Sequence, residues 1–315
     1  MKHYSLWLGL SSALALSGCT TENPAWLTQT KGLYCLGGVD STCLTEFGSS
    51  AFQAATASPE PDIDAMSQLA FGISIDGGEI PLEKDQVLDD RTAAFGEAGK
   101  LLRSENQVAI HAINEMKDTE AKAYALSRLL IIRGASMPDE QVNTVLNELF
   151  ALSKDQYLTG LWVKLPALLQ HGDYERAAVL RNVLLDGAAQ NQPFSMLALV
   201  ASAYTIAGLK DDAWGIAKAE SEKGRELTDD DRKLINAVME AASTNYPAPQ
   251  VFFDFTSDQV RLDAYLTISA LAHQVGKPEL ASRALNDAVK FIQKSSVKID
   301  RKKALANILF LANRS

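Results

Sequence analysis

Apolar residues recur at helical spacing almost without interruption from Glu83 onward, and this periodicity constrains the fold more than any other feature. Glycines and prolines interrupt the pattern every twelve to twenty residues, which is the usual length of a helix. The sequence therefore predicts an all-α fold, with one short strand expected at 251–255 (VFFDF) after a proline pair. In the segment 121–132 one helical face carries the apolar residues Ala121, Tyr124, Ala125, Leu129 and Ile132.

Three segments of the chain align on a glycine, and each has an alanine five residues later. A glycine permits a tight reversal of the chain, and a small residue early in the next helix lets paired helices approach closely. The pairs are Gly172 with Ala177, Gly208 with Ala213, and Gly276 with Ala281.

The aligned glycines lie 36 and then 68 residues apart, and this pattern resembles the tetratricopeptide repeat (TPR), whose period is about 34 residues. Tyr204 also matches the aromatic position of that family, whereas Leu168 and Ala272 do not. The resemblance is clearest over 156–294 and implies a right-handed α-solenoid of stacked antiparallel helix pairs over 63–315. The repeat expected near residue 242 is distorted by STNYPAPQVFFDF, and an irregular helical bundle is the alternative.

The resemblance to TPR arrays also implies a concave face lined by residues 13, 10, 6 and 3 positions before each aligned glycine. Trp162 would be the anchor for a partner, since aromatic residues contribute much of the energy of interfaces. The alternative is that Trp162 belongs to the core. The face would consist of Thr159, Trp162, Pro166, Leu169, Ser195, Ala198, Ser202, Thr205, Asp263, Leu266, Ala270 and His273.

The N-terminus predicts an exported protein. Lys2 and an apolar run from Leu6 to Leu16 suit a signal peptide over 1–18, and the run is too short to span a bilayer. Leu16-Ser17-Gly18-Cys19 resembles the lipobox of bacterial lipoproteins, which implies an acylated Cys19. Thr20 stands where an aspartate would resemble an inner-membrane retention signal, so we expect the periplasmic face of the outer membrane. An ordinary secreted protein or a buried apolar helix is the alternative.

Cys35 and Cys43 flank GGVDST, which resembles the pyrophosphate-binding loop of the PP-loop ATP pyrophosphatases. That loop works between a buried strand and a helix, but NPAWLTQTKG upstream is polar, and Leu36 replaces the first serine of the family pattern. We therefore expect a disulfide between the two cysteines, which pins a turn in an N-terminal extension. The small, polar residues that follow predict that 19–62 is a lipidated linker.

The remaining chemistry of the sequence is sparse. Without the leader, 29 Lys and Arg face 39 Asp and Glu, which argues against binding of nucleic acid or of an anionic membrane surface. His111, His171 and His273 lack metal-like spacing, and the acidic run 229–231 is typical of a helix N-terminus. We expect no enzyme activity, cofactor or metal.

These features together favour a lipid-anchored adaptor or scaffold that binds a protein or peptide in a cell-envelope assembly, such as secretion, pilus or outer-membrane machinery. Known lipoproteins of TPR-like architecture also regulate peptidoglycan or polysaccharide enzymes, and this is an alternative. A small-ligand binder with a pocket in the solenoid curve, or a purely structural spacer, are two others.

Overall fold

A computed structural model describes residues 41–57, 61, 63–187, 196–222, 227–243, 245–294, 296–300, 304, 307, 308 and 311. These residues form helices and connections without a strand, so the predicted all-α class is confirmed for them. None of their helices combines the length and the apolar character that crossing a membrane requires. The predicted leader, Cys19 and Cys35 lie outside the described residues.

The N-terminal helices pack in sequence order, and the tightest contact joins α3 to α4. Gly99 on α4 lies so close to α3 that a Cβ there would come within 2.5 Å of the Phe71 carbonyl oxygen. The helices are α2 (Ser41–Thr56), α3 (Ile63–Ile75), α4 (Asp90–Leu101), α5 (Asn106–Asn114) and α6 (Thr119–Arg133).

The segment expected to be a linker is in part a packed helix, which corrects the sequence analysis. Within the predicted linker 19–62, helix α2 covers 41–56 and contacts α3, and Ala51, Phe52 and Ala55 on it are buried. The small residues of this segment are compatible with a helix because alanine has the highest helix propensity. The buried residues Ala51, Phe52 and Ala55 join this helix to the core.

The later helices continue the same succession. A 3-10 turn (Gly134–Ser136) leads to α7 (Asp139–Leu152), α8 (Lys154–Leu161), α9 (Lys164–Gln170) and α10 (Tyr174–Gly187). Beyond them lie α11 (Met196–Ile206), α12 (Lys210–Glu222), α13 (Asp229–Ala242), α14 (Pro249–Phe253), α15 (Asp258–Gln274) and α16 (Pro278–Ile292).

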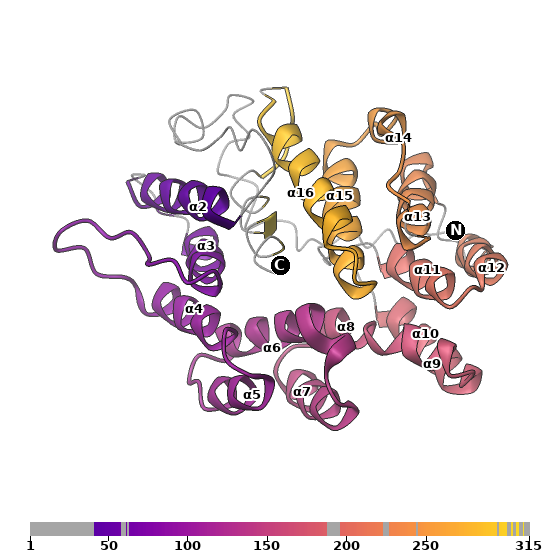
Figure 1. Cartoon of the computed structure of the whole chain (residues 1–315), viewed down its shortest axis with the longest axis horizontal. Coiled ribbons are helices and arrows are strands. Elements are labelled where there is room, and N and C mark those ends of the chain that lie inside the picture. Colours follow the sequence, from indigo (N-terminus) through magenta and orange to yellow (C-terminus); the bar gives the residue numbers. More distant parts are fainter. Residues whose placement is uncertain are drawn as a thin grey trace, which may run out of the picture.

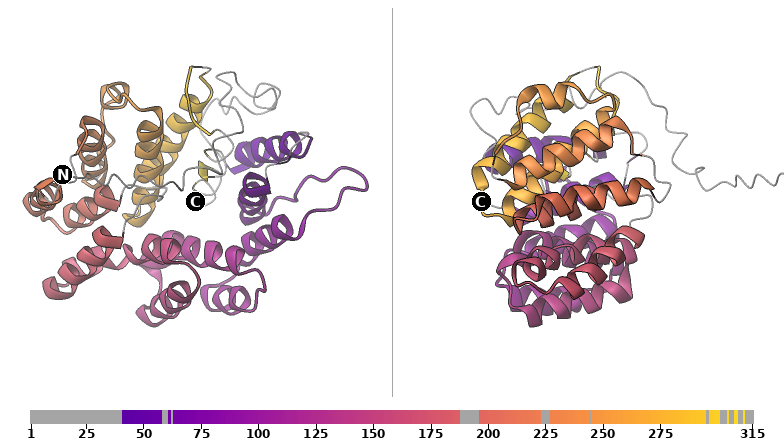
Figure 2. Two further views of the ribbon diagram at one scale, coloured as in Figure 1. Left: turned by 180° about the vertical axis from the view of Figure 1, so that it is seen from behind. Right: turned by 90° about the vertical axis from the view of Figure 1, so that its right-hand side faces the viewer.

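The helices are arranged in neighbouring pairs, which stack beside one another. Within pairs, α9 packs on α10, α11 on α12, and α15 on α16; between pairs, α9, α11, α13 and α15 contact each other in turn. Figure 1 shows that the succession bends round on itself, and α15 contacts α6. The side view in Figure 2 shows the helices lying one above another with similar axis directions.

The three aligned glycines sit at the predicted reversals. Gly172, Gly208 and Gly276 have φ of 73°, 82° and 67°, a region that glycine adopts without steric cost. In each, the residue after the glycine donates its N–H to the carbonyl four residues before the glycine, as in a Schellman motif. The partner alanines Ala177, Ala213 and Ala281 are buried, so the predicted close approach of paired helices is confirmed.

The distorted repeat also shows where the sequence prediction was wrong. The expected strand at 251–255 falls instead on α14, a helix of five residues that begins at Pro249, and on the turn after it. Proline favours the first turn of a helix because its fixed φ is already helical. Phe252 stacks on Tyr265 of α15 with ring centroids 4.4 Å apart, which holds this short helix against its neighbour.

Candidate functional site

The residues predicted to line a concave groove lie in the core instead. Trp162 is only 1% exposed, and Thr159, Ser202 and Thr205 are buried with it. The three hydroxyls donate to carbonyl oxygens of their own helices, those of Asp155, Leu199 and Ala201 respectively. Their protons are therefore not available for a hydrogen bond to a partner. Leu169, Ala198, Leu266 and Ala270 are buried too.

The remaining predicted residues are not gathered into an open groove either. Asp263 accepts a hydrogen bond from Gln259 on its own helix. His273 Nε2 lies 3.2 Å from the carbonyl oxygen of Leu311, whose side chain is part of the core. Residues near the C-terminus thus cover this end of α15, and Ser195 lies outside the described residues. The resemblance to open TPR arrays does not predict that residues near the C-terminus cover this end of α15.

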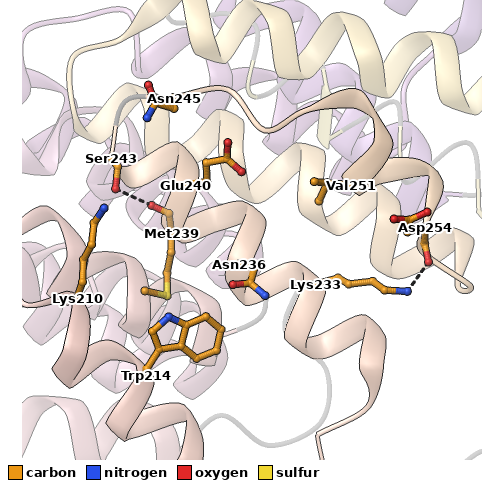
Figure 3. Close-up of a pocket in the computed structure, with 10 residues that line it drawn as sticks. All are labelled: Lys210, Trp214, Lys233, Asn236, Met239, Glu240, Ser243, Asn245, Val251 and Asp254. Atoms are coloured by element: carbon orange, nitrogen blue, oxygen red, sulfur yellow. Dashed lines mark hydrogen bonds between the residues drawn. The ribbon is translucent and has the colours of Figure 1, made fainter.

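An accessible hollow lies instead beside the second helices of the pairs. We call it the Trp214 groove, a hollow of about 550 Å³ between α12, α13 and α14 (Figure 3). Trp214 is 40% exposed, and Figure 3 shows its indole beside the side chain of Met239. The groove is lined by Lys210, Trp214, Lys233, Asn236, Met239, Glu240, Ser243, Asn245, Val251 and Asp254.

The Trp214 groove offers an aromatic surface with charges of both signs at its margins. Lys210 and Lys233 supply cations, and Glu240 and Asp254 supply carboxylates. Lys233 is held at one end, because its ammonium donates to the backbone carbonyl of Asp254 (Figure 3). The polar side chains of Asn236 and Glu240 are exposed, so they are available to a bound chain.

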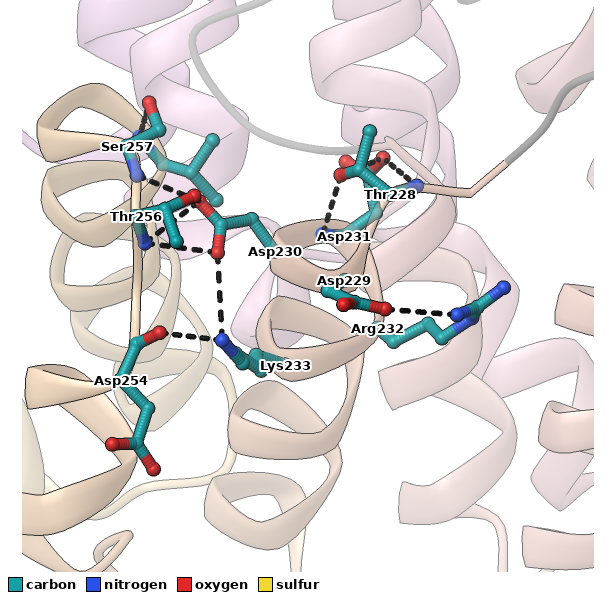
Figure 4. Close-up of polar contacts among 10 residues, drawn as sticks. Thr228, Asp229, Asp230, Asp231, Arg232, Lys233, Asp254, Thr256 and Ser257 are labelled. Carbon is teal, nitrogen blue, oxygen red and sulfur yellow. Dashed lines mark hydrogen bonds and ion pairs between the residues drawn. The ribbon is translucent and has the colours of Figure 1, made fainter.

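Below this groove the start of α13 is fixed by a buried carboxylate (Figure 4). Asp230 accepts hydrogen bonds from the backbone N–H groups of Thr256 and Ser257, at 3.0 and 2.7 Å, and from the Thr256 hydroxyl at 2.9 Å. Lys233 Nζ lies 3.7 Å from Asp230 Oδ1. Burial alone raises the pKa of Asp230, but these hydrogen bonds and the Lys233 charge outweigh burial, so the pKa is lowered.

The two sequence neighbours of Asp230, Asp229 and Asp231, make other contacts at the start of α13. Asp231 forms a capping box with Thr228, the N-cap residue of α13, and Asp229 pairs with Arg232 at 3.0 Å. The interpretation of this acidic run as a helix N-terminus is therefore confirmed. Within the described part of the chain, no group of His, Cys, Asp and Glu side chains is placed to hold a metal ion.

Another hollow, of about 410 Å³, lies between α3, α4, α6 and α8. Its charged groups largely engage one another. The Arg91 guanidinium bridges Asp64 and Glu120 at 2.7 and 2.6 Å, and the Arg128 guanidinium lies 4.4 Å from the ring centre of Tyr124. These contacts join three helices across the hollow, and we assign them to the stability of the N-terminal half.

The accessible surface of the described residues thus offers an exposed indole and mixed charges in a groove between helices. An exposed aromatic side chain flanked by polar and charged groups is typical of a binding surface. No family model, curated protein or solved structure matches the chain, so these contacts carry the functional argument.

Proposed function

We propose that this chain is a lipid-anchored adaptor or scaffold that binds a protein or peptide partner in a cell-envelope assembly. The helix pairs would form a right-handed, TPR-like solenoid. The observation that carries the proposal is the Trp214 groove, where a large aromatic side chain stays 40% exposed over a hollow between stacked helices. Tryptophan is enriched among the residues that dominate binding energy, and here it has room for a partner.

The composition of the groove favours a polypeptide partner. Met239 supplies an adaptable apolar floor, and Asn236 and Glu240 supply hydrogen-bonding groups for a peptide backbone. The lysines and carboxylates at its margins can select a partner by charge, which acts on specificity and on the association rate.

The proposed location in the cell envelope rests on the sequence alone. A basic start, an apolar run and Leu-Ser-Gly-Cys precede the body, and an acylated Cys19 would tether it. Cell fractionation of a Cys19→Ala variant tests this part: we expect the variant to leave the outer-membrane fraction. A variant that stays with the membranes like the wild type would contradict the anchor.

The binding proposal is tested in living cells with a photoreactive amino acid at position 236, an exposed site in the Trp214 groove. We expect a discrete adduct that disappears when Trp214→Ala is added. The control position is Val108, which is 56% exposed on the distant α5. An equal adduct in the Trp214→Ala background, or no adduct beyond that at position 108, would overturn the proposal that the Trp214 groove binds the partner.

A further inference from the structure

Helix α12 is separated from α10, the second helix of the preceding helix pair. It packs on α11, and α10 packs on α8, α9 and α11, but α10 and α12 make no extensive contact with each other. The space between them is a groove of about 670 Å³, which we call the α10–α12 groove. It is lined by Tyr174, Ala178, Arg181, Asn182, Leu185, Tyr204, Leu209, Asp211, Asp212, Gly215, Ile216, Ala219 and Glu220.

One helical face of each helix lines the α10–α12 groove. On α10 the lining residues are 174, 178, 181, 182 and 185, and on α12 they are 211, 212, 215, 216, 219 and 220, so in each helix they share one face. Leu185 and Ile216 form a buried apolar floor, while Tyr174 is 58% exposed at the rim. Two parallel ridges over an apolar floor are the surface against which a further helix packs.

Gly215 gives this groove a feature that the fold itself does not need. It lies inside α12, where glycine destabilises a helix by roughly 1 kcal/mol relative to alanine. A Cβ built at Gly215 meets nothing within 4 Å, so no neighbouring helix requires the missing side chain. Gly96, Gly99, Gly134 and Gly160 differ in this respect, because a Cβ at each would come within 3.0 Å of a neighbour. The open space over Gly215 allows a partner backbone to approach closely.

The charges around the groove indicate the sign of its partner. Asp211 and Asp212 place two exposed carboxylates in the first turn of α12, whereas Glu220 is buried. The single guanidinium, Arg181, is engaged by the Tyr204 hydroxyl and the Asn182 side chain, each 3.2 to 3.3 Å away. A cationic partner is therefore favoured, and an acidic one is repelled.

We propose that the α10–α12 groove binds a basic amphipathic helix of a protein partner, an inference that rests on the proposed function and names the class of partner. The apolar face of that helix packs on Leu185 and Ile216, its small residues cross over Gly215, and its lysine or arginine side chains reach Asp211 and Asp212. The bound helix fills the position between α10 and α12.

The test uses full-length protein in detergent and a synthetic 18-residue peptide of leucine and lysine at amphipathic helical spacing, with binding followed by fluorescence anisotropy. We expect Gly215→Arg to weaken binding at least tenfold, because the new side chain fills the groove. Gly215→Ala should bind within twofold of the wild type. The same peptide with glutamate in place of lysine should bind at least tenfold more weakly to the wild type.

A charge-matched pair of variants separates the groove from general attraction to an acidic protein. Asp211→Asn with Asp212→Asn removes two carboxylates from the first turn of α12, and Asp139→Asn with Glu140→Gln removes two from the first turn of α7. We expect about a fivefold loss of affinity for the first pair and none for the second. Equal losses, or unchanged binding by Gly215→Arg, would overturn the inference. Ala219→Arg, exposed in the same groove, replaces Gly215→Arg if that variant does not fold.

The two proposals fail separately. A missing adduct at position 236 in cells, together with groove-dependent peptide binding, would reject the Trp214 groove as the partner site in cells and retain the α10–α12 groove. An adduct that depends on Trp214, together with peptide binding that is unchanged in Gly215→Arg, would support the adaptor function and reject the proposal that the α10–α12 groove binds a basic helix.

Discussion

The side-chain amide of Gln274 donates a hydrogen bond to the backbone carbonyl of Ile131, 143 residues earlier in the chain. Gln274 is the last residue of α15, and Ile131 lies in the last turn of α6. The contact therefore joins two helix ends, where carbonyl groups lack the next turn of helix as a partner. It links the N-terminal and C-terminal halves of a chain that otherwise packs mainly neighbour on neighbour.

Replacing Gln274 tests how strongly this link holds the halves together. We expect Gln274→Ala to lower the free energy of unfolding by about 1 kcal/mol, because a net hydrogen bond is lost and a carbonyl is left without its partner. Helicity by far-UV circular dichroism should stay unchanged. Gln259→Ala, which removes an exposed contact within α15, is the control. Urea midpoints that fall equally in both variants would contradict a special role for Gln274.

Asp230 predicts a pH dependence whose sign follows from its lowered pKa. A carboxyl with a folded pKa below its unfolded value of about 3.9 contributes full stability above that value, and the contribution is lost as the pH falls through the folded pKa. We expect Asp230→Asn to lower stability at pH 7 by about 2 to 4 kcal/mol and to flatten the loss of stability in acid.

The control for Asp230 is its neighbour Asp229, which pairs with Arg232 at the surface. Asp229→Asn should change the free energy of unfolding by less than about 1 kcal/mol, since exposed ion pairs contribute little. Denaturant titrations between neutral and acid pH decide the matter. If the two variants lose stability to the same extent and with the same pH profile, the buried hydrogen bonds to Thr256 and Ser257 do not stabilise the fold as argued.

Gly208 and Gly215, two glycines in the same helix pair, allow the effect of backbone strain on stability to be distinguished from the effect of space for a side chain. A Cβ at Gly208 or at Gly215 meets no atom within 4 Å, but only Gly208 has a positive φ, of 82°. We expect Gly208→Ala to destabilise the protein by about 1 to 2 kcal/mol, and Gly215→Ala to stabilise it by up to about 1 kcal/mol. Thermal melts of the two variants measure opposite shifts; shifts of the same sign would contradict the glycine turn.

The sequence was sufficient to predict features that depend on local chemistry. Glycines with an alanine five positions later marked three helix reversals, and the acidic run 229–231 marked a helix N-terminus that the structure contains. Each of these features depends on residues within one turn of helix, so it can be recognised from spacing alone. The linker and the strand were predicted wrongly because Phe52 and Pro249 act through packing and chain context.

The candidate site depends on contacts that spacing does not show. Trp162 and Trp214 look alike in the sequence, yet one is buried and the other is exposed. Trp162 belongs to the core cluster, whereas Trp214 lies on α12 in the groove between α12, α13 and α14. The distorted repeat near residue 242 was a sequence signal for this region, because the segment STNYPAPQVFFDF contains Asn245, Val251 and Asp254, which line the Trp214 groove.

The two cysteines predicted to pair remain a prediction. Cys43 lies in the first turn of α2, nine positions before the buried Phe52, and Cys35 precedes the described residues. We expect peptides from non-reduced protein to show a linked species that is lighter by two hydrogens. Cys35→Ser with Cys43→Ser should lower the thermal midpoint less than Phe52→Ala does, because α2 is attached through its packed face. Free thiols at both positions in protein from the periplasm would contradict the disulfide.

Trp162 and Trp214 provide the last prediction, since the structure assigns one to the core and the other to a binding surface. Trp162→Ala empties a site that is 1% exposed, and we expect a loss of about 3 to 5 kcal/mol in the free energy of unfolding. Trp214→Ala removes a half-exposed indole and should cost less than about 1.5 kcal/mol, while it abolishes the photo-crosslink at position 236. Urea denaturation followed by far-UV circular dichroism compares the two. If Trp162→Ala is as stable as Trp214→Ala, Trp162 is not a core residue, and the concave groove predicted from the sequence becomes the better candidate site.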